Sequence, residues 1–287
     1  MTMNRAQRRQ AAKEFQSQLK DSDLAGAVDL ATSAQASKKV FMGYLTDEFV
    51  RVEFLRSLIA TAARSTELGY QVRPRDVEVT IERARALNLL LKSFLQTEDE
   101  YLLFADTNIA FAPQDVAMLI AADAPIAGAL YFTAATGAES WPTAWVEQEP
   151  PAGVEGKELA DYAPEFLDGP QYVPVTLPAP PEDLLPTYEV TEDMSAEDKA
   201  EADRRQEAMG AWAAELSLPI PVAGVGFGLA LIQRRVAEEM AEAFQWPFEA
   251  VQDRREDLTF CLRAGELGLQ TVVLPAARVG HMRQGMI

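Results

Sequence analysis

Short runs of apolar residues alternate along the chain with segments in which apolar residues recur every three or four positions. The first run, from about Lys39 to Leu45, predicts a strand, and the segment from Thr46 towards Gly69 predicts a helix. A second helical pattern is followed by the strand YLLFA, which is too apolar to be half exposed. Later strands are expected in PIAGALYF, IPVAGVGFGLALI and LQTVVLPA.

This alternation is typical of an α/β protein. Strands that are apolar throughout are buried on both faces, so the predicted fold is a mostly parallel sheet covered by helices. Ligands of such sheets bind at the carboxyl ends of the strands. Asp106 and Asn108 follow YLLFA directly, and they mark the expected position of a site.

Two segments depart from the α/β pattern. Residues 1–37 are rich in Gln, Ala, Ser and charged residues and predict a loose tail, which leaves residues 38–287 as the folded domain. Within that domain, residues 147–217 carry 9 of the 17 prolines and 18 acidic against 4 basic residues. They predict an acidic, proline-rich insertion or flap.

The insertion explains most of the net charge of −18, because 18 acidic and 4 basic residues contribute −14. The rest of the chain is nearly neutral and has no basic stripe for phosphate backbones, so duplex DNA is the less expected partner. The single cysteine, Cys261, excludes an intramolecular disulfide and suits a reducing compartment. No apolar run reaches the roughly 18 residues of a membrane span. These features predict a cytoplasmic protein.

Five polar residues are candidates for chemistry. Asp106 and Asn108 could converge on one hard cation and the phosphates it carries, although Asp and Asn also commonly stabilise turns. Glu256 and Asp257 open a predicted helix, where a catalytic role competes with simple stabilisation by the helix dipole. His281 is the only histidine and follows the last predicted strand, so it could bind a metal or lie at the surface.

Aromatic and glycine-rich motifs add two further observations. Trp141, Trp145 and Trp246 could stack on sugar rings, or they could anchor the core or the flap. The motif GVGFG lacks the G-x-G-x-x-G spacing of dinucleotide-binding units and comes late in the chain. A dinucleotide-binding protein is therefore the inferior interpretation.

The order of these motifs resembles the GT-A glycosyltransferases that use nucleotide sugars, particularly small phage and bacterial members. The matching stretches are VFMGYL, ARALN, YLLFADTNIAFAP, VGFGLALIQRRV, WPFE, REDLTFCLRAGELGL and the terminal VGH. The resemblance implies a GT-A, Rossmann-like fold and the transfer of a sugar from a nucleotide-diphosphate donor with the help of Mn²⁺ or Mg²⁺. It implies a protein or glycan acceptor, such as a virion protein, and the host cytoplasm if a phage encodes the chain.

On the donor side, the resemblance implies a role for each matching residue. Asp106 and Asn108 fall on the Asp-x-Asp motif, which holds a divalent metal and the sugar nucleotide, and His281 falls on a histidine that completes the metal site. Arg85 falls on an arginine that faces the nucleotide. Backbone close to the donor sugar is expected at two glycines, Gly226 and Gly228.

On the acceptor side, Asp257 with Glu256 beside it falls on the acidic element that supplies the general base in inverting members. Asn108 departs from the family pattern, because it replaces the second Asp of the motif. Its amide oxygen can bind a cation but brings no charge, so the metal should be held more weakly or depend on the donor's phosphates. Two alternatives stay open: a DNA-base glycosyltransferase, and a non-catalytic nucleotide-sugar-binding protein that has lost its metal site.

Overall fold

The structure is a computed structural model that describes residues 38–46, 50–78, 82–134, 140–148, 171–177, 218–251 and 254–281, with Ser195, Glu201 and Arg204. The tail predicted for residues 1–37 lies outside the described residues. So does most of the insertion predicted for residues 147–217.

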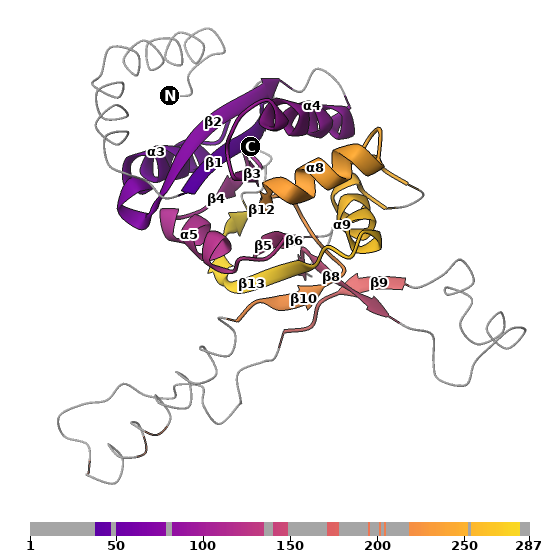
Figure 1. The fold of residues 1–287 in the computed structure, drawn as a ribbon. Helices are drawn as coiled ribbons and strands as arrows, with labels where there is room; N and C mark the ends of the chain where they lie inside the picture. Colours follow the sequence, from indigo (N-terminus) through magenta and orange to yellow (C-terminus); the bar gives the residue numbers. More distant parts are fainter. Residues whose placement is uncertain are drawn as a thin grey trace, which may run out of the picture.

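A seven-stranded sheet forms the centre of the molecule, in the order β10-β13-β5-β12-β3-β1-β2 (Figure 1). Its strands are β1 (Lys38–Thr46), β2 (Tyr70–Glu78), β3 (Tyr101–Ala105), β5 (Ile126–Leu130), β10 (Ile220–Val222), β12 (Leu229–Gln233) and β13 (Thr271–Arg278). β12 runs antiparallel to both of its neighbours and β10 runs antiparallel to β13, whereas the other strands share one direction. The sheet is therefore mostly parallel.

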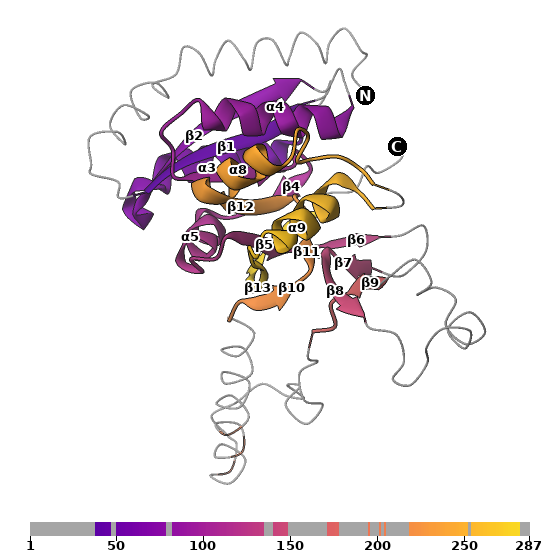
Figure 2. The same cartoon turned by 45° about the vertical axis from the view of Figure 1, so that its right-hand side comes forward.

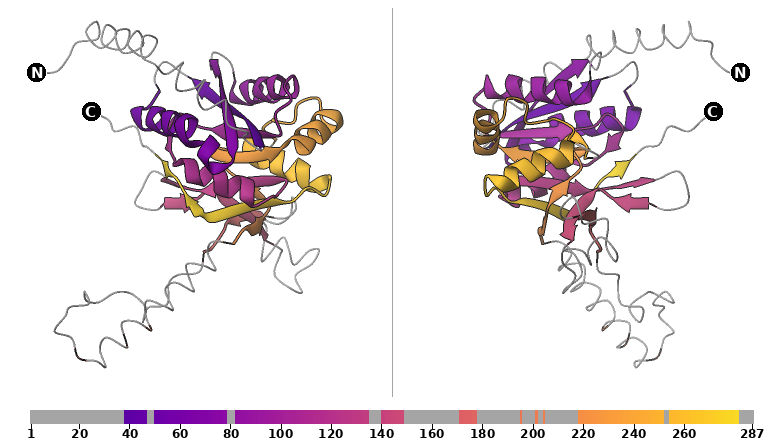
Figure 3. Two further views of the ribbon diagram at one scale, coloured as in Figure 1. Left: turned by 60° about the vertical axis from the view of Figure 1, so that its left-hand side comes forward. Right: turned by 90° about the vertical axis from the view of Figure 1, so that its right-hand side faces the viewer.

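Helices cover both faces of the sheet (Figures 2 and 3). They are α3 (Val52–Arg64), α4 (Arg83–Leu95), α5 (Pro113–Ala121), α8 (Arg234–Ala243) and α9 (Glu256–Glu266), and a short 3₁₀ helix, η1 (Thr66–Leu68), follows α3. One core cluster joins α4, α8 and α9 to strand residues such as Phe104, and another joins α3 and α5 to strand residues such as Leu103. Neighbouring residues of β3 thus enter opposite layers, as the alternation of side chains along a strand requires.

The predicted α/β fold class is confirmed: a large, mostly parallel central sheet is covered by helices. All five residues of β3 are buried, which explains its continuous apolar sequence. The predicted helix start at Thr46 is wrong, because Thr46 is the last residue of β1 and α3 begins at Val52 after an extended Arg51.

Short strands outside the central sheet position its loops. β11 (Gly224–Val225), β8 (Ala144–Gln148) and β9 (Gln171–Pro174) form a three-stranded sheet, and β6 (Phe132–Ala134) pairs with β7 (Ser140–Pro142). β14 (Gly280–His281) pairs with β4 (Ile109–Ala110), which sets His281 opposite Ile109. The C-terminal end of the described chain therefore returns to the loop after β3.

No helix of the described residues is long and apolar enough to cross a membrane.

Candidate functional site

The loop after β3 lies at the carboxyl end of a strand in the parallel part of the sheet, where a site is expected. The backbone N–H of Asp106 donates to the carbonyl of Gly228 at 2.8 Å, and the N–H of Ile109 donates to the carbonyl of Asp106 at 3.0 Å. These two bonds hold the loop against the turn that precedes β12. The side chains of Asp106 and Asn108 therefore leave a turn whose backbone is fixed on both sides.

Asn108 and His281 lie in contact although 173 positions separate them. Asn108 Nδ2 is 3.3 Å from His281 Nε2, and the pairing of β4 with β14 brings the two residues together. The ring of Tyr131 stacks on the His281 ring with centroids 5.9 Å apart. Asn108 Oδ1 is buried and has no hydrogen-bond partner among the described residues. The loop after β3 and the end of the chain thus form one corner, as the sequence led us to expect.

Arg83, the first residue of α4, links the loop after β3 to the start of α9. Its Nη2 lies 3.0 Å from Asp106 Oδ1, and its Nε lies 2.6 Å from Glu256 Oε1. Burial lowers the pKa of the Arg83 guanidinium, but Asp106, Glu256 and Asp257 together raise it above its ordinary value. Arg83 is therefore a fixed positive charge among three carboxylates.

The arginine predicted for the donor side was Arg85, which the structure places elsewhere. Side chains two positions apart on a helix are rotated by about 200° about its axis and point to nearly opposite sides. Arg83 and Arg85 therefore cannot both face Asp106. Arg85 is exposed and lines a cavity on another side of α4. The sequence contained a signal for Arg83, because it opens the helix before YLLFA, but it did not distinguish between the two arginines.

Glu256 and Asp257 are the first two residues of α9, and both side chains are buried. Asp257 Oδ1 accepts the backbone N–H of Leu258 at 2.9 Å. Burial raises the pKa of Asp257, and the negative charge of Glu256 adds to that shift, while the neighbouring arginines and the Leu258 N–H oppose it. Asp257 is consequently a better proton acceptor than an exposed aspartate, whereas Glu256 is engaged by Arg83.

Tyr131 explains why positions 226 and 228 are occupied by glycines. Its hydroxyl accepts the N–H of Gly228 at 3.0 Å, and a Cβ on Gly228 would lie 2.6 Å from its ring carbon Cζ. A Cβ on Gly226 would collide with the same hydroxyl. Burial, with the charges of Asp106 and Asp257, raises the pKa of Tyr131, so its phenol stays protonated. Tyr131 has no distinguishing signal in the sequence, where it is one more residue of the apolar stretch PIAGALYF.

The three predicted metal ligands form a mixed set of one carboxylate, one amide and one imidazole. In the part of the chain that the structure describes, no group of three or more His, Cys, Asp or Glu side chains is arranged so that it could hold a metal ion. The 3.3 Å contact joins the amide nitrogen of Asn108, which can only donate, to His281 Nε2, so a cation bound at His281 Nε2 would have to replace this contact. The amide oxygen Oδ1 of Asn108, which has no hydrogen-bond partner among the described residues, is the atom of this side chain that could bind a cation. A cation at these residues would need most of its ligands from a bound diphosphate.

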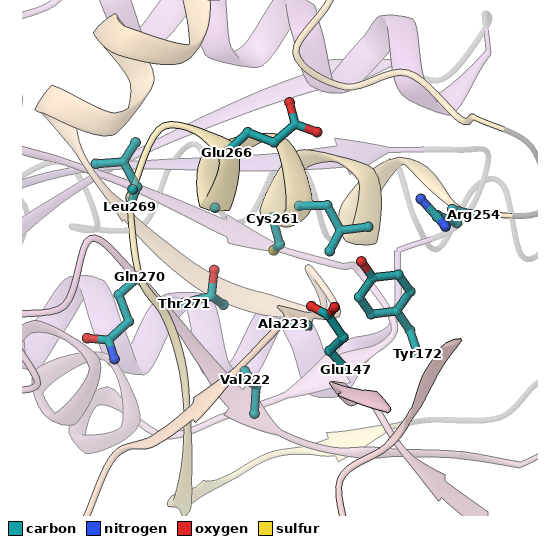
Figure 4. A pocket seen from close by; sticks show the side chains of 13 residues that line it. Glu147, Tyr172, Val222, Ala223, Arg254, Cys261, Glu266, Leu269, Gln270 and Thr271 are labelled. Atoms are coloured by element: carbon teal, nitrogen blue, oxygen red, sulfur yellow. The ribbon is translucent and has the colours of Figure 1, made fainter. Parts of the chain in front are cut away.

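Two cavities lie among the described residues. The larger, about 610 Å³, lies between α9 and the strands β8, β9 and β10, and Figure 4 shows Glu147 and Tyr172 facing α9 across it. The guanidinium of Arg254 stacks over the Tyr172 ring at 5.0 Å, and no predicted site residue lines this cavity. The smaller, about 540 Å³, lies between α4 and residues 246–250 and includes Arg85 and Trp246.

Comparison with known proteins gives weak likenesses. No family model matches the sequence, and no curated protein matches it either. The solved structures that match include the following three. The structure titled A197 from STIV has 12% identity and a TM-score of 0.44, with 86% of this chain and 87% of that chain covered. GalNAc-T7 with UDP, GalNAc and Mn²⁺ has 11% identity and a TM-score of 0.49, with 87% of this chain and 44% of that chain covered. The inositol-1-phosphate CTP transferase from T. maritima has 10% identity and a TM-score of 0.36, with 87% of this chain and 91% of that chain covered.

At identities of 10–12% and TM-scores below 0.5, these likenesses do not identify what this chain binds. The chain also spans only 44% of the length of the GalNAc-T7 structure. A functional assignment must therefore come from the chain's own geometry.

Proposed function

We propose that the chain is a glycosyltransferase that moves a sugar from a nucleotide-diphosphate donor to a glycan or protein acceptor with the help of a divalent cation. The observation that supports this most is the contact between Asn108 and His281 beside Asp106, at the carboxyl end of β3. Oxygen and imidazole ligands at a strand end suit a cation with its phosphates. The phage or bacterial type and the cytoplasmic location stay predictions.

On the donor side, Asp106, Asn108 and His281 would hold the cation through a carboxylate, an amide and an imidazole. A bound Mn²⁺ or Mg²⁺ would offset the negative charge that develops on the departing nucleoside diphosphate. The chain's own contribution is to fix these side chains. The stacking of Tyr131 on His281 and the backbone bond between Asp106 and Gly228 both limit their movement.

On the acceptor side, Asp257 is the candidate base. Burial raises the pKa of its carboxyl, and Oδ1 accepts the Leu258 N–H. In the proposed inverting reaction, the acceptor oxygen bonds to the anomeric carbon while the bond from that carbon to the phosphate oxygen breaks. The nucleoside diphosphate leaves with the electron pair, and the acceptor's proton passes to Asp257. General base catalysis of this kind contributes about 10²- to 10⁴-fold in rate.

The proposal is tested by release of the nucleoside diphosphate from a panel of nucleotide sugars with Mn²⁺. We expect the wild type to cleave at least one donor, and we expect His281→Ala and Asp106→Asn to lose most of this activity. Asn108→Asp should lower the Mn²⁺ concentration needed for half-maximal activity, because it adds a charged ligand. Full activity of Asp106→Asn and His281→Ala without added metal would refute the metal-assisted role.

A second candidate function is a non-catalytic nucleotide-sugar-binding protein. The observation that favours it is the ion pair of Arg83 with Asp106, which already neutralises the only carboxylate of the three predicted ligands. A cationic Arg83 could itself receive a diphosphate without a metal. Calorimetric binding of a nucleotide sugar, equal with and without Mn²⁺ and without donor cleavage, would support this candidate over the first.

A further inference from the structure

The cavity of about 540 Å³ between α4 and residues 246–250 has an exposed tryptophan at its rim. Trp246 is 48% exposed, whereas Trp145 is half-buried and the side chain of Trp141 lies outside the described residues. The exposed indole therefore offers a flat apolar surface to a ligand in the cavity.

The backbone beside Trp246 is held rigidly. Asn88 Nδ2 donates to the carbonyl of Phe248 at 2.6 Å, and Asn88 Oδ1 accepts the Phe248 N–H at 3.1 Å. From the other side, Arg263 Nη1 donates to the carbonyls of Trp246 at 2.6 Å and Pro247 at 3.2 Å. The Phe248 ring stacks on Phe260 in the core, with centroids 4.3 Å apart. The loop is therefore anchored in a conformation that leaves the indole exposed.

The polar residues around the indole have mixed charge. Glu82 and Glu249 are acidic and Arg85 is basic, and the Glu249 carboxylate is paired with Arg263 at 3.0 Å. A phosphate-bearing ligand would need a surplus of positive charge, which this cavity lacks. A neutral polyhydroxylated ligand suits it better, since carboxylates and a guanidinium can bond hydroxyl groups while the indole covers an apolar ring face.

The cavity adjoins the candidate site through two elements. Arg83, which contacts Asp106 and Glu256, lies between the lining residues Glu82 and Ala84. The lining segment 246–250 also leads along the chain to the start of α9. The cavity and the candidate site therefore share the first turn of α4, from opposite sides of the helix.

We propose that this cavity is a saccharide-binding subsite in which the indole of Trp246 stacks on one face of a neutral sugar ring of the acceptor. The inference rests on the proposed glycosyltransferase function and makes the acceptor a glycan rather than a bare peptide. Trp246 presents the flat apolar surface, and Glu82, Arg85 and Glu249 supply hydroxyl contacts.

The test is saturation-transfer NMR of the full chain with glucose, galactose, mannose, N-acetylglucosamine and lactose, without any nucleotide sugar. We expect transfer to at least one saccharide, and we expect Trp246→Ala to weaken its binding about 10- to 30-fold. Trp246→Phe, which keeps an aromatic face, should give intermediate binding. Leu267→Ala removes an exposed apolar side chain at the far end of α9 and should bind as the wild type does.

The outcomes separate this inference from the proposed function. Equal saccharide binding by the wild type and a folded Trp246→Ala variant would overturn the subsite, and so would the absence of transfer to every saccharide in the panel. Transfer of sugar to an unglycosylated peptide, unaffected by Trp246→Ala, would also overturn it. Saccharide binding through Trp246 in a chain that binds no nucleotide sugar would leave the subsite standing and remove the proposed glycosyltransferase function.

Discussion

Replacing Arg83 by alanine tests the charge network that joins the loop after β3 to α9. The guanidinium makes contacts of 3.0 Å to Asp106 and 2.6 Å to Glu256, and its side chain is only 30% exposed. The contact to Asp106 is a charge-assisted hydrogen bond, which contributes roughly 1.5–3 kcal/mol, and the contact to Glu256 is an ion pair without hydrogen-bond geometry. Partial exposure of the guanidinium lowers both contributions. Losing both contacts should therefore destabilise the fold by about 3 kcal/mol.

For a domain of this size, about 3 kcal/mol corresponds to a fall in Tm of roughly 6–12 °C. The measurement is thermal and urea unfolding followed by circular dichroism. Arg85→Ala is the matched control, because Arg85 lies two residues along the same helix, is exposed and has no ion pair among the described residues. We expect Arg85→Ala to stay within about 0.5 kcal/mol of the wild type. Equal stability of the two variants would refute the assignment of Arg83 as the linking charge.

Four further predictions concern Asp257, Gly228, Tyr131 and Asn108. Because burial raises the pKa of Asp257, its carboxyl contributes stability that is present below the ordinary value of 3.8 and is lost as pH rises through the folded value. Asp257→Asn should therefore unfold at a higher temperature than the wild type at neutral pH, lose this advantage below pH 3.8, and transfer no sugar. Gly228→Ala should destabilise by about 1–3 kcal/mol in urea unfolding, since its Cβ would meet the Tyr131 ring. Tyr131→Phe should partly rescue Gly226→Ala, whose clash is with the hydroxyl, but not Gly228→Ala; rescue of both would contradict this geometry. Asn108→Asp should bind Mn²⁺ more tightly in calorimetry, and unchanged affinity would argue against Asn108 as a ligand.

The sequence predicted the inner strands of the sheet well and its edge poorly. β3 is buried along its whole length, so its composition alone marked it as a central strand. β2 was not predicted, because it is an edge strand with the partly exposed sequence YQVRPRDVE. Its Pro74 and charged residues suit an edge strand, which has a neighbouring strand on one side only. They also mean that β2 contains no continuous apolar run by which a strand could be predicted.

The candidate site was predictable where it depends on strand ends. Asp106 and Asn108 follow a recognisable strand, and His281 follows another, so their meeting could be inferred from the rule for α/β sheets. Arg83 and Tyr131 could not be identified in this way. Their positions depend on which way a helix faces and on a ring that fills the space left by two glycines, and both are properties of packing.

Calorimetric titration of nucleotide sugars into the wild-type chain, with and without Mn²⁺, tests the central claim most directly. We expect at least one nucleotide sugar to bind the wild type more tightly when Mn²⁺ is present. In His281→Ala we expect the affinity to be the same with and without Mn²⁺. Absence of binding by every nucleotide sugar in the presence of Mn²⁺ would contradict the account, because the corner formed by Asp106, Asn108 and His281 would then hold no diphosphate.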